Sequence, residues 1–349
     1  MKSIAEKIRP EGPNLEWNEL EKIVRTIAKE QKESSLEILN DIFRTATKLA
    51  KESPGTLNLK IVSTVLKELR YSFKVFSPYR DIPKITIFGS ARVSPKDPNY
   101  QLAKEFAEEA VRSNYMIVTG GGPGIMAAGN EGADGKSFGL NIRLPLEQTA
   151  NRFVSEQSKL IHYKYFFTRK LFLVKLASAF VLFPGGMGTF DELFEILTLL
   201  QTGKTNPMPV LLLETKGFAF WKGFREFLEK QVVARDFISQ SDLSLFRVAH
   251  SATEAMAHIR HFYRVFHSIR YVKDKLVIRL KLQPSPKILT QLNKKFSCLA
   301  TDGVITLSAP LPEESNEPEY KDLPRLVFKF DRKDYGALRY LLDFVNDEA

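Results

Sequence analysis

The chain has 349 residues, which corresponds to about two domains at the usual ~150 residues each. Its composition of 44% apolar, 26% charged and 11% aromatic residues excludes a disordered chain, a collagen-like chain and a low-complexity scaffold. A net charge of +10 at pH 7 favours anionic partners such as nucleotides, although a merely basic surface explains it equally well. No Lys/Arg run is interleaved with aromatic residues, so we expect no nucleic acid polymer as partner.

The N-terminal region predicts helices without a targeting segment. Its first residues, MKSIAEKIRPEGPN, contain no apolar h-region, and no apolar stretch of the chain approaches the ~18 residues of a membrane helix. We therefore expect a soluble, cytoplasmic protein with no membrane partner. Apolar residues recur at helical spacing over 14–78, interrupted at Pro54 and Gly55, which predicts a helical N-terminal extension over 1–83.

From Lys84 to Phe266, short apolar runs alternate with helical stretches. The runs are Ile85–Phe88, Tyr115–Thr119, Phe138–Ile142, Ala179–Phe183 and Val210–Leu213, and the helical stretches fall at about 100–113, 124–134, 164–177 and 190–202. Continuous apolar runs are typical of parallel strands that are buried on both faces. We therefore expect an α/β domain over 84–266 with a Rossmann-like, doubly wound parallel sheet.

The remaining residues, 267–349, predict a separate small α+β domain. An alternating strand over Tyr271–Leu280 precedes a helix, two further strands and a last helix, at about 286–299, 303–308, 325–330 and 334–346. The stretch 310–320 is rich in Glu and Pro, which predicts an exposed loop. The chain's one cysteine, Cys298, excludes a disulfide within the chain and a Cys-rich zinc site.

The first of two glycine-rich loops is Thr119–Met126, TGGGPGIM, which follows a predicted strand and begins a helix. Glycines let the backbone approach a ligand, and the free N–H groups of a helix N-terminus favour an anion. We therefore interpret Gly120, Gly121 and Gly122 as ligand-binding residues. The loop also fits a dinucleotide fingerprint, but the next strand ends in Asn-Ile-Arg, at 141–143, where an NAD-binding protein carries an acidic residue.

The second loop is Pro184–Glu192, PGGMGTFDE, in which Gly185, Gly186, Gly188 and Thr189 offer backbone N–H groups and a hydroxyl. Each loop taken alone is explained equally well by a tight strand-to-helix turn. Both loops, however, follow predicted parallel strands, whose carboxyl ends form the ligand-binding edge of an open α/β sheet. Together they predict a site for a phosphorylated small molecule.

The pair GGGPGIM and PGGMGTFDE resembles the motifs of the Lonely Guy (LOG) family, often labelled "lysine decarboxylase-like", which carries GGG-x-x-G-x-M and PGG-x-G-T-x-x-E. An Arg-Lys pair precedes the second motif in that family, here Arg169-Lys170, and the 23 residues from Arg169 to Glu192 suit its spacing. The resemblance covers about residues 84–232. With its helical N-terminus and its tail, the chain is similar to the longer bacterial members, which act as nucleotide 5′-monophosphate nucleosidases.

The resemblance implies an N-ribohydrolase that cuts the N-glycosidic bond of a nucleoside 5′-monophosphate, purine or cytokinin-type, and releases a free base and ribose 5-phosphate. It also implies a homo-oligomer, at least a dimer. The decarboxylase label would imply pyridoxal phosphate, but Lys170 and Lys204 have no sequence context for a Schiff-base lysine. We therefore expect no cofactor, and the five histidines have no metal-ligand spacing, so we expect no metal.

Glu192 has two interpretations. Thr189-x-x-Glu192 matches a capping box, in which the Glu carboxylate accepts from the Thr backbone N–H. With the family resemblance, Glu192 is instead a catalytic carboxylate that stabilises an oxocarbenium-like state or activates water. Asp191, where the family often has Glu, is expected to bind ribose hydroxyls, or else to be a favourable charge at a helix N-terminus.

Arg169 is flanked at helical spacing by Tyr165, Phe166, Phe172 and Leu173, which are largely apolar. A charged group in such a setting is rarely buried without a partner, so we expect a catalytic Arg that faces the ligand rather than one that extends into solvent. Lys170 is expected to add to the positive field at the phosphate.

Four further residues are assigned to the substrate site by the resemblance. Ser90 follows the first strand, where a small residue borders the nucleotide, and a plain turn is the alternative. Glu147, Gln148 and Asn151, in LPLEQTAN, resemble a segment on the base or ribose side of the longer bacterial members.

Two other functions compete with the hydrolase. Molybdenum cofactor carriers have a similar fold and bind a phosphorylated pterin without hydrolysis, and a basic regulatory protein could sense nucleotides through its tail. A pure carrier has no need of Arg169 with Glu192, which favours the hydrolase.

Overall fold

The computed structural model describes residues 22, 24–26, 28, 33–143, 150–154 and 158–348. Residues up to Lys67 form one compact unit, and Glu68–Ala349 form another. In the described part of the chain, no helix is both long and apolar enough to cross a membrane. The expected boundaries at 83/84 and 266/267 stay predictions.

The described residues of the first unit include α2 (Glu33–Glu52) and the beginning of α3 (Thr56–Phe76). Gly55 separates the two helices with a φ of +84°, a left-handed conformation that favours glycine. The predicted interruption of the helical pattern at Pro54 and Gly55 is therefore confirmed. The last turns of α3 belong to the second unit, where Glu68, Ser72 and Phe76 are buried.

The described residues of the second unit contain a seven-stranded sheet in which all neighbouring strands are parallel, in the order β4-β3-β2-β1-β5-β6-β7. The strands are β1 (Lys84–Phe88), β2 (Met116–Thr119), β3 (Ser137–Ile142), β4 (Leu160–Tyr163), β5 (Ala179–Leu182), β6 (Val210–Leu213) and β7 (Arg247–Ala249). The five predicted strands are confirmed as β1, β2, β3, β5 and β6, which are fully buried. The edge strands β4 and β7 were not predicted, because they are short and partly exposed.

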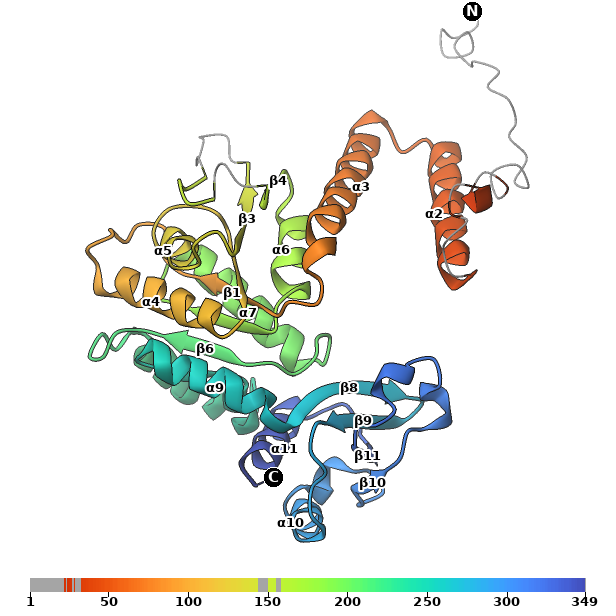
Figure 1. Ribbon diagram of the computed structural model, residues 1–349, viewed down its shortest axis with the longest axis vertical. Helices are drawn as coiled ribbons and strands as arrows, with labels where there is room; N and C mark the ends of the chain where they lie inside the picture. The colour runs from red at the N-terminus through yellow and green to blue at the C-terminus, as the bar shows by residue number, and fades with distance from the viewer. Residues whose placement is uncertain are drawn as a thin grey trace, which may run out of the picture. The chain divides into compact units, whose positions relative to one another are not determined.

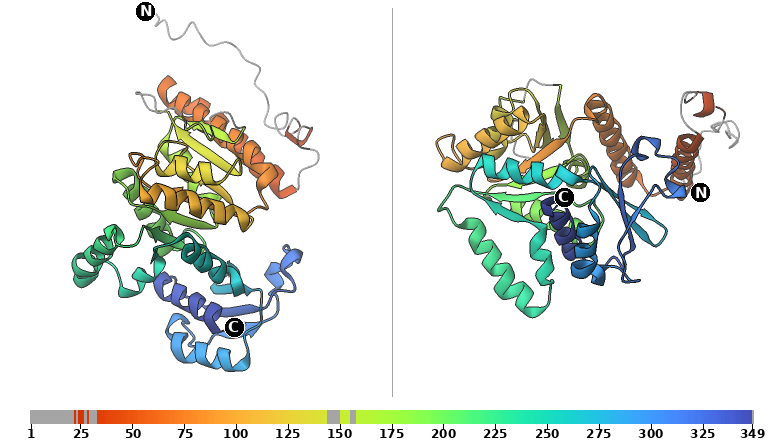
Figure 2. Two further views of the ribbon diagram at one scale, coloured as in Figure 1. Left: turned by 60° about the vertical axis from the view of Figure 1, so that its left-hand side comes forward. Right: turned by 60° about the horizontal axis from the view of Figure 1, so that its bottom comes forward.

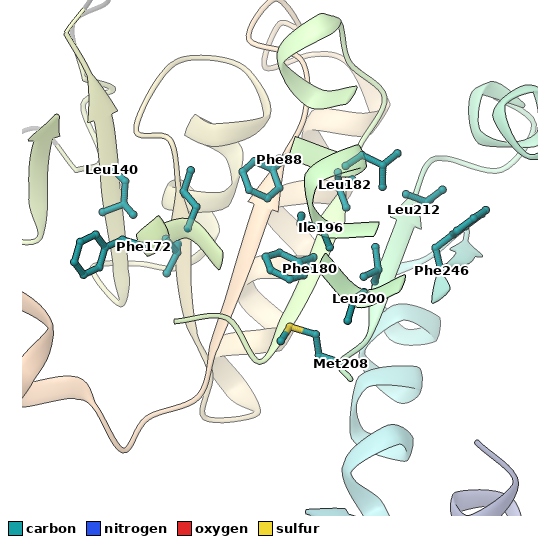
Figure 3. Close-up of a cluster of buried hydrophobic side chains, with 14 of the residues drawn as sticks. Phe88, Leu140, Phe172, Phe180, Leu182, Ile196, Leu200, Met208, Leu212 and Phe246 are labelled. Atoms are coloured by element: carbon teal, nitrogen blue, oxygen red, sulfur yellow. The ribbon is translucent and has the colours of Figure 1, made fainter. Parts of the chain in front are cut away.

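Helices cover both faces of this sheet, as expected of a doubly wound fold (Figure 1). One face packs against α4 (Pro98–Arg112), α5 (Ile125–Gly132) and α9 (Ala252–Val265), and the other against α6 (Phe166–Lys175), α7 (Met187–Gln201) and α8 (Phe220–Phe227). Figure 3 shows the second layer, where Phe172 of α6 and Ile196 of α7 lie against strand residues such as Leu140 and Phe180. This apolar layer packs α6 and α7 against the face of the sheet.

The tail forms a second, antiparallel sheet in the order β10-β11-β9-β8. Its elements are β8 (Phe266–Val272), β9 (Lys275–Leu280), α10 (Pro286–Phe296), β10 (Thr306–Ser308), β11 (Arg325–Lys329) and α11 (Tyr335–Glu348). The single strand expected over 271–280 is wrong, because Lys273 takes a φ of +56° and turns the chain into a hairpin between β8 and β9.

The last helix, α11, packs beside α9 of the first layer (Figure 2). Asn346 Oδ1 accepts hydrogen bonds from the backbone N–H groups of Val265 (2.9 Å) and Phe266 (3.2 Å), while Asn346 Nδ2 donates to Leu342 O at 2.9 Å. Since Val265 ends α9 and Phe266 begins β8, the Asn346 side chain ties α11 to the point where the chain passes from the parallel-sheet region into the second sheet.

The expectation of an exposed loop over 310–320 is wrong at Glu314, whose side chain is 1% exposed. Arg279 of β9 and Arg325 of β11 lie directly opposite each other in the antiparallel pair. Two like charges at such a position repel, so a carboxylate between them is required. Glu314 Oε1 accepts from Arg279 Nε at 2.9 Å, and Glu314 Oε2 accepts from Arg325 Nε at 2.9 Å. We call Arg279, Glu314 and Arg325 the tail triad.

Candidate active site

A cavity of about 620 Å³ lies at the carboxyl ends of β1, β2, β3 and β5. This is the edge at which an open α/β sheet binds ligands. The described residues that line it are Phe88, Gly89, Ser90, Ala91, Arg92, Gly120, Met126, Asn141, Ile142, Arg169, Leu173, Gly186, Met187, Gly188, Thr189 and Glu192. They come from the ends of β1 and β3, from the turn after β1, from the two glycine loops, and from the helices α5, α6 and α7.

The turn at Ser90 holds the two glycine loops together. Ser90 N donates to Pro184 O at 3.1 Å, and Ile125 N donates to Ser90 O at 3.0 Å. A Cβ atom at Gly124 would lie 2.3 Å from Ser90 O, and the φ of Gly124 is +66°. Both facts require glycine at position 124. The missing side chain leaves room for the close approach of the Ser90 backbone, and not for a ligand.

Asn151 supports the first loop from behind. Its backbone N donates to Gly121 O at 2.8 Å, and its Nδ2 donates to Gly122 O at 3.0 Å and to Asn130 Oδ1 at 2.9 Å. Thr119 Oγ1 donates to the same Asn130 oxygen at 2.8 Å and accepts from Gly121 N at 2.9 Å. The amide of Asn151 is thus engaged in holding the loop and does not line the cavity.

Buried polar contacts fix the position of α6. Glu68, at the start of the second unit, accepts hydrogen bonds from Lys164 N at 2.6 Å and from Thr168 Oγ1. Thr86 Oγ1 of β1 donates to Leu173 O of α6 at 2.9 Å. The helix is therefore anchored at both ends of the segment that carries Arg169.

Arg169 reaches from α6 across to α7, where its Nη2 donates to Glu192 Oε1 at 3.5 Å. The side chains are 14% and 3% exposed, so the pair lies in the wall of the cavity and is almost excluded from water. Two polar atoms of the pair, Arg169 Nε and Glu192 Oε2, are buried without a hydrogen-bond partner among the described residues. Such unsatisfied groups are costly in a buried site unless a ligand completes them.

The capping-box interpretation of Glu192 is wrong for this structure. The helix α7 has Gly186 as its N-cap, without a side-chain capping bond, and the backbone N–H of Thr189 donates to Gly186 O at 3.0 Å. The carboxylate of Glu192 instead faces Arg169, with Lys170 Nζ 3.7 Å from its second oxygen.

Burial dominates the electrostatics of the pair. Desolvation raises the pKa of Glu192 above its ordinary value, while Lys170 and Arg169 oppose this rise. Burial likewise lowers the pKa of Arg169, against the opposing effect of Glu192. The Arg169 guanidinium favours the ionised carboxylate of Glu192, but this contribution to the pKa is smaller than the effect of burial. A carboxylate with a raised pKa in a cavity is typical of catalytic acids and bases.

Lys170 and Asp191 lie beside the cavity rather than in its wall. Lys170 Nζ contacts Asp191 Oδ2 at 2.8 Å and Glu195 Oε2 at 2.7 Å. Burial lowers the pKa of Lys170, but its bonds to Asp191 and Glu195 outweigh burial and leave the pKa raised. The Asp191 side chain is 59% exposed. The geometry gives Asp191 a partner in Lys170.

Seven of the residues predicted for the site line the cavity: Ser90, Gly120, Arg169, Gly186, Gly188, Thr189 and Glu192. The other six predicted residues do not line the cavity. Four of them belong to the glycine loops or hold them, and two form an ion pair beside the cavity: Gly121, Gly122, Asn151 and Gly185, and Lys170 with Asp191. Glu147 and Gln148 lie outside the described residues.

Three residues that were not predicted for the site, Arg92, Met126 and Asn141, also line the cavity. Arg92 follows Ser90 in the same turn, and Met126 belongs to the first motif, so their positions next to predicted site residues could have identified them. Asn141 gave a different signal, since it is a polar residue within the buried apolar strand FGLNI.

The fold and this site define an α/β protein with a cavity beside the N-termini of two helices, α5 and α7. Residues 123–259 match a family model described as "Possible lysine decarboxylase". The cytokinin riboside 5′-monophosphate phosphoribohydrolase LOG2 of Arabidopsis thaliana is 30% identical over 152 residues, which cover 43% of this chain and 70% of that protein. The cytokinin riboside 5′-monophosphate phosphoribohydrolase of Rhodococcoides fascians is 26% identical over 201 residues, covering 52% and 98%.

The chain therefore belongs to the LOG family, as the two glycine motifs predicted. Among solved structures, the molybdenum cofactor binding protein of Rippkaea orientalis is similar, with a TM-score of 0.36, 17% identity, and coverage of 51% of this chain and 96% of that one.

The family description invites a test for pyridoxal phosphate. A decarboxylase of that kind needs a lysine that forms a Schiff base inside the cavity. None of the described residues that line the cavity is a lysine, and the Lys170 ammonium is held by Asp191 and Glu195. The residues present do not fit that cofactor.

Proposed function

We propose that the protein hydrolyses the N-glycosidic bond of nucleoside 5′-monophosphates and releases a free base and ribose 5-phosphate. The observation that carries this proposal is the buried pair of Arg169 and Glu192 in the wall of a cavity that begins at the N-terminus of α7. The names of the relatives, which are phosphoribohydrolases of cytokinin riboside 5′-monophosphates, support the same reaction class.

The N-terminus of α7 suits the 5′-phosphate. Gly186, Gly188 and Thr189 line the cavity there, and at Gly186 and Gly188 no atom lies within 4 Å of where a Cβ would be. Open glycines at a helix N-terminus leave backbone N–H groups accessible to an anion, and the helix dipole favours negative charge. Glu192 follows one turn later on the same helix, so a phosphate at the N-terminus brings the ribose to this carboxylate.

Glu192 would act on the ribose. In the proposed reaction the bond from C1′ to the base nitrogen breaks, its electron pair leaves with the base, and the base takes up a proton. The positive charge that develops at C1′ is stabilised by the ionised carboxylate, and water adds its hydroxyl group to C1′. Arg169 holds the carboxylate toward the cavity and keeps part of it ionised despite burial.

The experiment is release of free base from AMP, GMP, IMP, CMP and UMP, compared with adenosine under the same conditions. We expect release from at least one nucleotide and far slower release from the nucleoside, because the phosphate supplies binding energy that positions the ribose. Binding of nucleotides without release of base would contradict the proposal and favour a non-hydrolytic carrier or sensor. Equal turnover of AMP and adenosine would contradict the assignment of the phosphate to the α7 N-terminus.

A further inference from the structure

The side chain of Asn141 has no structural explanation in the free protein. It lies in β3, whose six residues are all buried, and it is 4% exposed. Asparagine is disfavoured in strands, and the amide atoms of Asn141 are not among the fully buried polar atoms, because they remain accessible from the cavity. The structure gives this amide no hydrogen-bond partner among the described residues, yet it lines the cavity.

The other asparagines buried within residues 68–349 are all engaged. Asn99 Oδ1 accepts from Thr215 N at 3.0 Å, Asn130 Oδ1 accepts from Thr119 Oγ1 at 2.8 Å, and Asn346 holds the end of α9. Asn141 is therefore the exception among these four side chains. Its amide offers one acceptor oxygen and two donor hydrogens to whatever enters the cavity.

The strand order decides which part of a nucleotide would meet it. The α7 N-terminus follows β5, and β3 is three strands away in the order β3-β2-β1-β5. Strands are ~4.8 Å apart, so Asn141 lies roughly 14 Å from the phosphate end of the cavity. A phosphate at Gly186 and a ribose at Glu192 leave the base as the part that extends toward Gly120, Met126 and Asn141.

Apolar side chains complete the same end of the cavity. Ile142 is adjacent to Asn141, Leu173 lies on α6, which packs against β3, and the sulfur of Met126 lies beside Gly120, 2.7 Å from where a Cβ would be. Apolar and thioether groups pack well against the faces of an aromatic ring, whereas one amide can bond to its edge.

We propose that Asn141 reads the hydrogen-bonding edge of the nucleobase and so sets the base preference of the enzyme. The inference rests on the proposed function. An asparagine amide pairs well with a base edge that carries a donor next to an acceptor, as adenine does with its amino group and N7. Asn141 is in this proposal a specificity-determining residue, while Glu192 and Arg169 act at the sugar.

The test uses Asn141→Leu, which keeps the size of the side chain and removes its hydrogen bonds. In a Glu192→Gln background, in which we expect turnover to be about 100-fold slower or more, we measure binding of AMP and of ribose 5-phosphate by calorimetry. We expect AMP to bind about 5- to 100-fold more weakly after Asn141→Leu and ribose 5-phosphate to bind as before, because only AMP carries a base. An equal loss for both ligands, or no loss for AMP, would overturn the inference.

The same substitution in the active enzyme separates this inference from the proposed function. We expect the differences in kcat/KM among the five nucleotides to shrink with Asn141→Leu. If the wild-type chain releases no base from any nucleotide, the proposed function fails. If it releases base and Asn141→Leu leaves the relative kcat/KM values unchanged, the inference alone fails.

Thermal unfolding distinguishes a ligand-binding role of Asn141 from a structural one. Loss of a structural side chain lowers the unfolding midpoint, whereas loss of a side chain that waits for a ligand does not. Since the amide has no partner to lose, Asn141→Leu should leave the midpoint unchanged or raise it. The matched control is Asn130→Leu, which removes the acceptor of Thr119 and Asn151 and should lower the midpoint. A fall for Asn141→Leu as large as that for Asn130→Leu would assign Asn141 a structural role and overturn the inference.

Discussion

The second unit buries arginine and glutamate together in two places, and the two groups differ in how completely they satisfy each other. In the tail triad, both oxygens of Glu314 are bonded, at 2.5–2.9 Å to Arg279, 2.9 Å to Arg325 and 3.0 Å to Leu311 N. In the pair of Arg169 and Glu192, the one hydrogen bond is 3.5 Å long, and one atom of each side chain is buried without a hydrogen-bond partner among the described residues.

The pKa shifts of the two glutamates have opposite directions for this reason. Burial acts to raise both. For Glu314 it is outweighed by the bonds from Leu311, Arg325 and Arg279, and the pKa is lowered. For Glu192 the cations are too distant to outweigh burial, and the pKa is raised. A complete set of bonds indicates a structural role, and an incomplete set beside a cavity indicates a group that awaits a ligand.

The largest effect is expected from Glu314→Gln. It removes the carboxylate that bonds both opposed guanidiniums and leaves Arg279 with Glu317 alone, and breaking a buried ion pair in this way costs about 3–5 kcal/mol of unfolding free energy. Urea denaturation followed by circular dichroism measures this loss. The turnover of the folded fraction should not change, and a large loss of turnover in folded protein would contradict the purely structural role of the tail triad.

Glu192→Gln should have the opposite effects to Glu314→Gln, with a small change in unfolding free energy and a large loss of turnover. It keeps the size of the side chain but cannot supply a full negative charge at C1′, so turnover of AMP should fall by about 100-fold or more. Glu195→Gln is the matched control, because it makes the same change one turn along α7, also beside Lys170, but outside the cavity lining. Near wild-type turnover in folded Glu192→Gln would remove the catalytic role of this carboxylate.

The pH dependence of kcat/KM tests the raised pKa of Glu192, which distinguishes it from Glu314. The proposed reaction needs ionised Glu192, whose pKa lies above the ordinary 4.5, so activity should be lost as the pH falls toward that raised pKa. Lys170→Met removes the larger of the two opposing influences, and the acid limb of kcat/KM should therefore move to higher pH. The phosphate of the substrate titrates identically with both enzymes, so the shift between their profiles is the diagnostic quantity.

Lys175→Met is the matched control for this shift, because it removes an exposed lysine of the same helix that forms no ion pair with a described carboxylate. Its acid limb should coincide with that of the wild type. An unchanged or lowered limb in Lys170→Met would contradict the electrostatic description of Glu192.

The smallest effect is expected from Asp191→Asn. The carboxylate is largely exposed and contacts Lys170 outside the cavity lining, and exposed ion pairs are worth ~0–1 kcal/mol. We expect kcat/KM for AMP to change by less than about fivefold. A loss comparable to that of Glu192→Gln would show that Asp191 contacts the ribose after all.

Much of the fold could be predicted because the five central strands are continuous apolar runs buried on both faces. The edge strand β7, Arg247–Ala249, is three residues long and partly exposed, so it gives no such signal. The turn at Lys273 was missed because a left-handed residue is usually marked by glycine or asparagine, and here it is lysine.

The charged pair of the candidate site could be predicted from the sequence, but only some of the other residues that line the cavity could. The motifs located Arg169 and Glu192, and the structure brings them together across α6 and α7. Which other side chains face the same cavity depends on the strand order, which places β3 beside β2, and this order is not written in any local pattern. In the sequence Asn141 was therefore marked only as a polar residue in an apolar strand and not as a cavity residue, and Asn151, which shares its residue type, is engaged in supporting a loop.

The bonds of Asn346 at the end of α9 have a consequence for how the chain is made. During synthesis the N-terminal parts of a protein fold first. The backbone N–H groups of Val265 and Phe266, however, find their acceptor only in a residue 80 to 81 positions later. On the ribosome, the parallel sheet can therefore be assembled while the joint to the second sheet is still open, and this joint closes only after residue 346 has emerged.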